Sequence, residues 1–112
     1  MAEEARRLGH HDWACFASHQ AAEKAVKALH LAAGQEAWGH GVAKLLEELP
    51  ATFGVPDDLV EKGRSLDNYY IPTRYPNGHP EGPPFEHYGP LQSEQAEDHA
   101  RAILGFVRSE MA

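Results

Sequence analysis

The chain has 112 residues, 42% of them hydrophobic, and a formal net charge of −7 from 10 basic and 17 acidic side chains. This length fits one compact core, so we expect residues 1–112 to form a single domain. The negative charge disfavours general attraction to nucleic acids and anionic membranes, so phosphate chemistry would require a local cluster. The single cysteine, Cys15, excludes an intrachain disulfide and a cysteine-based zinc site. Without a long apolar run or a signal-like leader, the sequence predicts a cytoplasmic protein without a membrane span.

A short first helix is expected at residues 3–8, before Gly9. A long helix follows from Asp12 to about Ala33, because this segment is rich in Ala and contains no Pro or Gly. Gly34 is a suitable helix stop. An apolar stripe and an adjacent stripe of alanines predict close approach of other helices and a homodimer. The polar face is expected to carry Gln20, Glu23, Lys24, Lys27 and His30, with an ion pair between Glu23 and Lys27.

Three more helices are predicted, at residues 42–49, 56–67 and 91–111, from apolar residues at helical spacing. Pro50 ends the first of them, and Gly63 costs the second about 1 kcal/mol relative to Ala. Residues 68–90 are rich in Pro, Gly and aromatic residues, which predicts a long ordered loop before the last helix. The sequence therefore predicts an all-α, up-and-down helical bundle of four to five helices.

Arg74 and His79, five positions apart in the Pro-rich loop, are the strongest candidates for catalysis. Arginine offers a planar cation for phosphate, and histidine can transfer a proton near neutral pH. Together they suit phosphodiester cleavage without a metal ion. The alternative is structural: Arg74 bonds to loop carbonyl groups, and His79 lies in solvent.

Two further groups could bind substrate or nucleotide. Asp67 could orient the arginine, while Tyr69, Tyr70 and Tyr75 could donate hydrogen bonds to phosphate oxygens. The tyrosines could equally fill the core with their hydroxyl groups in water. Lys24 and Lys27 could face an anionic ligand, or could belong to a solvated helix face.

Eight histidines raise the question of a metal site, but none of them pairs within one helix at a spacing that converges on a metal ion. We therefore expect no metal and no cofactor. His40 is interpreted as a helix-start residue and His19 as a core histidine. Trp13 and Trp38, which bracket the long helix, are interpreted as packing anchors.

The sequence resembles the HEPN family in several segments. These are residues 12–16, leading into residues 20–29; His40 before the Leu45–Leu46 pair; and residues 66–76, with the sequence LDNYYIPTRYP. The resemblance implies a helical bundle that usually forms dimers. Many family members are metal-independent endoribonucleases with an Arg-x4-6-His motif at the dimer interface, a spacing that Arg74 and His79 satisfy.

Small members of this family are often encoded beside a minimal nucleotidyltransferase, the two acting as toxin and antitoxin. Two hypotheses follow from the resemblance. The chain is either an endoribonuclease toxin that acts through Arg74 and His79, or a non-catalytic subunit that binds a nucleotide or a nucleotidyltransferase. The sequence leaves open whether the protein is an enzyme.

Overall fold

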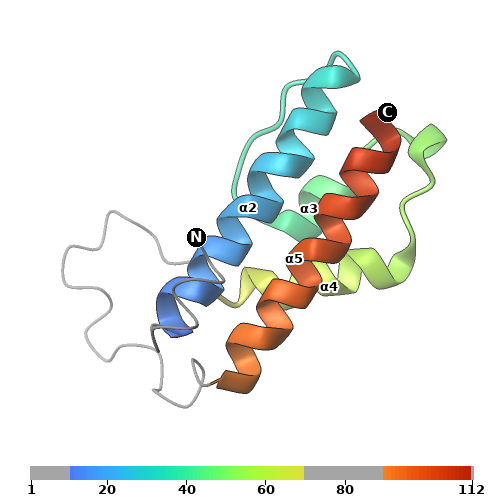
Figure 1. Ribbon diagram of the computed structural model, residues 1–112. Coiled ribbons are helices and arrows are strands. Elements are labelled where there is room, and N and C mark those ends of the chain that lie inside the picture. The colour runs from blue at the N-terminus through green and yellow to red at the C-terminus, as the bar shows by residue number, and fades with distance from the viewer. Residues whose placement is uncertain (1–10, 70–89, 112) are drawn as a thin grey trace.

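The computed structural model describes residues 11–69 and 90–111. Within these ranges all regular elements are helices, and the predicted all-α bundle is confirmed (Figure 1). Each predicted helix of the described part agrees with an observed one to within two residues. The predicted helix at 3–8 and nearly all of the predicted loop lie outside the described residues. The elements are α2 (His11–Ala32), α3 (Val42–Glu47), the 3-10 helix η1 (Ala51–Phe53), α4 (Asp57–Asp67) and α5 (Pro90–Met111).

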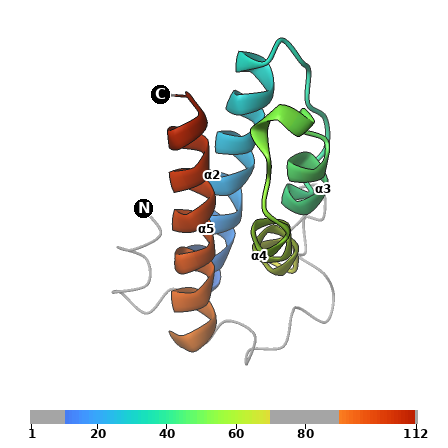
Figure 2. The same cartoon turned by 90° about the vertical axis from the view of Figure 1, so that its right-hand side faces the viewer.

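The two long helices, α2 and α5, lie side by side and run in the same direction (Figures 1 and 2). The shorter helices α3 and α4 pack against each other, and both contact α2. Figure 2 shows α4 end-on while α2 and α5 stand upright, so α4 crosses the long helices. None of the described helices is long and apolar enough to span a membrane.

The core lies between these helices and is built mainly of aliphatic side chains. Cys15 is fully buried in α2, as predicted for a small apolar residue. The six-residue helix α3 is too short to be stable alone, so its buried leucines, Leu45 and Leu46, must hold it in place by packing. Gly34, with a φ of +77°, follows the end of α2 as predicted.

The helical glycine Gly63 explains the close packing of α4 on α3. A Cβ atom at this position would lie 3.0 Å from Cγ1 of Val42 and 3.1 Å from the backbone nitrogen of Ala43. The sequence identified only the cost of a glycine to the helix. The structure shows that the missing side chain allows the two helices to approach.

Two interpretations of aromatic residues are wrong. The exposed fraction is 57% for Trp13 and 80% for Trp38, so neither is a packing anchor of the core. The ring of Trp13 contacts Phe16 with a centroid separation of 5.8 Å, at the surface of α2. Small and aliphatic side chains fill the space between the helices instead.

The predicted polar face of α2 also needs correction, because Glu23 and His30 are buried. The segment after α2 folds back along this face and brings α3 against it. Nε2 of His30 donates a hydrogen bond of 2.8 Å to the carbonyl oxygen of Leu45, and Nδ1 of His30 lies 3.0 Å from Oε1 of Gln35. The part of this face that carries Glu23 and His30 is therefore an internal polar interface.

Candidate functional site

Asp67, the last residue of α4, joins three helices. Its Oδ1 accepts hydrogen bonds from the backbone N–H of Val42 at 2.7 Å and from Nε2 of His19 at 3.1 Å. Its Oδ2 accepts a bond of 3.2 Å from the N–H of Ala43. The residue that precedes α3, Gly41, has no side chain to cap the helix, so Asp67 satisfies these donors from a distant part of the chain.

His19 lies in the interior of this junction, and its interpretation as a core histidine is confirmed. Its side chain is fully buried, and its Nδ1 lies 4.0 Å from Oε1 of Glu23, one helical turn further along α2. His19 therefore stands between two carboxylates, those of Asp67 and Glu23. We call His19, Glu23, Lys27, His40 and Asp67 the polar junction.

Glu23 joins the other two members of the polar junction, Lys27 and His40. Its Oε2 accepts hydrogen bonds from Nζ of Lys27 at 2.8 Å and from Nδ1 of His40 at 3.0 Å. The predicted ion pair with Lys27 is confirmed. Burial by itself raises the pKa of Glu23, but the hydrogen bonds and charges of Lys27 and His40 together outweigh it and lower the pKa below the ordinary value of 4.5.

The interpretation of His40 as a helix-start residue is wrong. Gly41 stands at the start of α3, and Asp67 supplies the hydrogen bonds there. His40 instead attaches the segment between α2 and α3 to Glu23. Its role is to connect that segment to α2.

The substitution Glu23→Gln should lower the free energy of unfolding near pH 7 by about 1 kcal/mol, since a partly exposed pair of this kind contributes modestly. The pKa of Glu23 is lower in the folded state than in the unfolded chain. The contribution of Glu23 to the stability of the fold is therefore present above the pKa in the unfolded chain, and it is lost as the pH falls through the pKa in the folded state. The difference between the two proteins should therefore shrink below about pH 4. Urea unfolding of the wild-type and Glu23→Gln proteins, from acidic to neutral pH, measures this difference in stability. A difference that does not change with pH would contradict the lowered pKa of Glu23.

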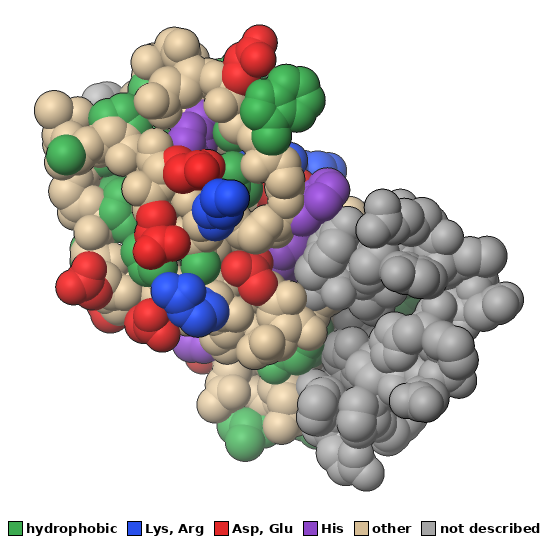
Figure 3. Space-filling model, turned by 180° about the vertical axis from the view of Figure 1, so that it is seen from behind, with side chains coloured by type: hydrophobic (Ala, Val, Ile, Leu, Met, Phe, Trp, Pro, Cys, Tyr) green, Lys and Arg blue, Asp and Glu red, His purple; other side chains and the backbone are tan. Residues whose placement is uncertain are grey.

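The two candidate lysines have different environments. Lys24 is exposed on α2, whereas Lys27 is half-buried and bonded to Glu23. The charge of Lys27 is thus largely balanced within the protein, which weakens the prediction that both lysines face one ligand. Figure 3 shows the back of the molecule, where acidic and basic side chains are interspersed and the described residues form no broad basic patch.

Among the candidates near the loop, only Asp67 and Tyr69 belong to the described residues. Tyr69 is partly buried against the core, and burial first, then the electrostatic interaction with Cys15, raises the pKa of its phenol. This supports the core-filling alternative for Tyr69 and keeps its hydroxyl protonated at neutral pH. The predicted residues Tyr70, Arg74, Tyr75 and His79 lie outside the described residues, and their roles stay predictions.

Sequence reasoning missed that His19, Glu23 and His40 act together with Asp67. One signal was available: His19 and Glu23 are four residues apart and therefore share a face of α2. The links to His40 and Asp67 join residues 17 and 48 positions apart, which no local pattern reveals. Within the described residues, no group of three or more histidine, cysteine, aspartate or glutamate side chains is arranged to hold a metal ion.

The two long helices pack side by side, and the polar junction links one of them, α2, to the short helices α3 and α4. This arrangement defines a small helical-bundle protein. The chain belongs to the HEPN family, because the HEPN domain model matches residues 1–110. The resemblance noted from the sequence is thereby confirmed.

Solved structures agree with this assignment. The chain is 55% identical to TT1696 from Thermus thermophilus, with a TM-score of 0.84, covering 96% of this chain and 85% of that protein. It is 36% identical to ST0689, an archaeal HEPN homologue, with a TM-score of 0.79, covering 99% and 86% of the two chains. An HEPN domain protein from Thermotoga maritima is 33% identical, with a TM-score of 0.78 and coverage of 98% and 87%. No curated protein matches the chain.

Proposed function

We propose that this HEPN protein is a homodimeric binding subunit that associates with a minimal nucleotidyltransferase. The observation that supports this proposal is Trp38, a large aromatic side chain that is 80% exposed in the segment between α2 and α3. Exposed tryptophans are frequent at the centres of protein interfaces, where they contribute much of the binding free energy. The negative net charge agrees better with a protein partner than with RNA.

The segment that carries Trp38 is attached to α2 on both sides of this residue. The side chain of Gln35 lies 3.0 Å from His30, and the backbone N–H of Gln35 donates a bond of 2.9 Å to the carbonyl oxygen of His30. His40 donates to Glu23 on the other side. Because these contacts restrict the segment before binding, a partner that covers Trp38 would lose less conformational entropy.

Other apolar groups, on α2, are also exposed. Leu31, in the last turn of α2, is 69% exposed. The alanines Ala21 and Ala32 are exposed on the same helix, and such small side chains let a second helix approach closely. These features support association through α2, both with a second copy of the chain and with a partner.

The substitution Trp38→Ala should weaken binding of a minimal nucleotidyltransferase partner by about 30-fold, as expected for loss of an aromatic hot spot of about 2 kcal/mol. Sedimentation of the two purified proteins, separately and mixed, measures both this affinity and the dimer formed by the chain alone. The matched control is Leu91→Ala at the start of α5, at the end of the bundle opposite the last turn of α2, where the side chain is also exposed and little change is expected. Equal affinity for the wild-type and Trp38→Ala proteins, or a monomer at micromolar concentration, would contradict the proposal.

A metal-independent endoribonuclease is the second candidate function. One observation favours it: Asp67 fixes the end of α4 to α2 and α3, and Arg74 follows in the sequence only seven residues later. A fixed helix end just before Arg74 suits a catalytic segment, because catalytic groups must be held in a defined geometry. Arg74 would stabilise charge on the phosphate, and His79 would transfer the proton.

The test of this candidate is RNA cleavage in buffer containing a chelator. Both Arg74→Ala and His79→Ala should lower the cleavage rate by about 100-fold or more, in keeping with the usual contribution of a general acid or base. Arg108→Ala, on the exposed surface of α5, serves as the control for general charge effects. If the activity survives the loss of both Arg74 and His79, it arises from another site or from a contaminant.

A further inference from the structure

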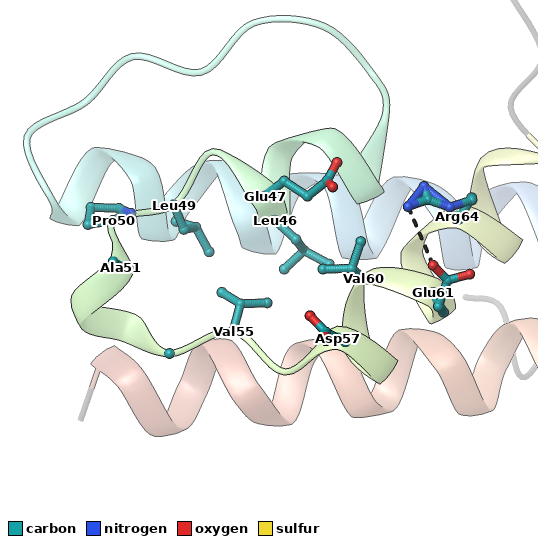
Figure 4. Close-up of a pocket in the computed structure, with 11 residues that line it drawn as sticks. Leu46, Glu47, Leu49, Pro50, Ala51, Val55, Asp57, Val60, Glu61 and Arg64 are labelled. Carbon is teal, nitrogen blue, oxygen red and sulfur yellow. Dashed lines mark ion pairs between the residues drawn. The ribbon is translucent and has the colours of Figure 1, made fainter.

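A cavity of about 750 Å³ opens between α3, η1 and α4 (Figure 4). Its floor is apolar, because Leu46 of α3, Val60 of α4 and Val55 of the connection before α4 point into the same space. Leu46 and Val60 belong to the core, so the floor is held in place by the packing of both helices. The volume lies within the range of known ligand sites.

The rim of this groove is acidic. Glu47, Asp57 and Glu61 line it and are exposed, and the lining cation, Arg64, lies 3.4 Å from Glu61 as an ion pair. Three carboxylates against one guanidinium leave a net charge of −2 around an apolar floor. This combination repels phosphate groups and attracts cations that also carry apolar surface.

We propose that this groove binds a short segment of a partner protein in which an apolar side chain is flanked by Lys or Arg. The apolar side chain occupies the space between Leu46, Val55 and Val60. The flanking cations face the carboxylates of Glu47 and Asp57. The groove is built from residues 46–64, a part of the chain separate from the segment that carries Trp38, so it is a second interaction surface.

The probes are three labelled peptides of about twelve residues: one alternating Lys and Leu, one with Ser in place of Leu, and one with Glu in place of Lys. Fluorescence anisotropy measures their binding to the full chain. The Lys–Leu peptide should bind about tenfold more tightly than the Lys–Ser peptide, which has the same charge, and than the Glu–Leu peptide. This comparison separates occupation of the groove from general attraction to an acidic protein.

Two variants locate the site. Glu47→Lys reverses a rim charge and Val55→Trp fills the floor, and each should weaken binding of the Lys–Leu peptide about fivefold or more. Glu94→Lys on α5 makes the same charge change at an exposed position away from the groove and should change affinity by less than about twofold. Circular dichroism identifies any variant that does not fold. If a variant does not fold, the wild-type chain is titrated with the Lys–Leu peptide instead. The site is then located by shifts of the NMR methyl signals of Leu46, Val55 and Val60.

Several results would overturn the proposal. The first is equal binding of the Lys–Ser and Lys–Leu peptides, and the second is equal weakening by Glu94→Lys and Glu47→Lys. The third is a set of methyl shifts in this groove that appear with the Glu–Leu peptide but not with the Lys–Leu peptide. The last result would assign the groove to a different class of ligand.

Discussion

Replacing Asp67 with alanine is expected to lower the free energy of unfolding by about 3 kcal/mol, the sum of a lost helix cap and a lost buried hydrogen bond. The substitution removes the acceptor for the backbone N–H groups of Val42 and Ala43, and a lost helix cap costs about 0.5–2 kcal/mol. It also removes the hydrogen bond to His19, whose side chain is fully buried, which adds about 1–3 kcal/mol. Urea unfolding followed by circular dichroism measures the sum.

Asp58→Ala is the matched control for Asp67→Ala, because it removes the same group from the same helix. Asp58 is exposed, and its ion pair with Lys62 at 3.1 Å is a surface pair, so a loss of at most about 1 kcal/mol is expected. Asp67→Asn should fall between the two, since the amide keeps one acceptor oxygen. If Asp67→Ala were no more destabilising than Asp58→Ala, Asp67 would not be the residue that holds the three helices together.

Gly63→Ala should destabilise the protein by about 1–3 kcal/mol, although alanine favours helix more than glycine does. The added methyl group would meet the backbone nitrogen of Ala43 at 3.1 Å and Val42 at 3.0 Å, and backbone atoms of a packed helix cannot move aside cheaply. The loss should exceed the intrinsic gain in helix propensity of about 1 kcal/mol. Chemical unfolding at constant pH gives the value.

The control for this substitution is Gly105→Ala in α5. Gly105 is also a helical glycine, but a Cβ atom at this position would meet no atom within 4 Å. This substitution should therefore stabilise the protein by about 0.5–1 kcal/mol. Effects of the same sign at both positions would show that contact between α3 and α4 does not decide the outcome at Gly63.

Both predictions concern the packing of α3 and α4, the helices that flank the candidate functional segments. Asp67 ends α4, and Gly63 sets how closely α4 lies on α3. His40 and Glu23 hold the segment that presents Trp38. Destabilising the polar junction should therefore also affect partner binding, through the position of Trp38 rather than through its chemistry.

Local patterns in the sequence were enough to place the four described α-helices and to predict the class of fold. Residues 12–33 lack Pro and Gly and repeat their apolar positions at helical spacing, and the observed helix α2 covers 11–32. Helix formation depends on the intrinsic propensity of each residue and on neighbours three or four residues apart. It can therefore be predicted without knowing how the chain packs. The family resemblance was also visible from the order of residues alone.

The environment of the polar and aromatic side chains, in contrast, depended on how distant segments pack. Glu23 and His30 were expected in solvent, but α3 and the segment before it fold onto that face and bury both. Trp38 was expected in the core, yet the segment that carries it exposes it. Burial depends on which distant segments come together, as the hydrogen bond from His19 to Asp67 across 48 positions illustrates. A single sequence does not contain that information in any local pattern.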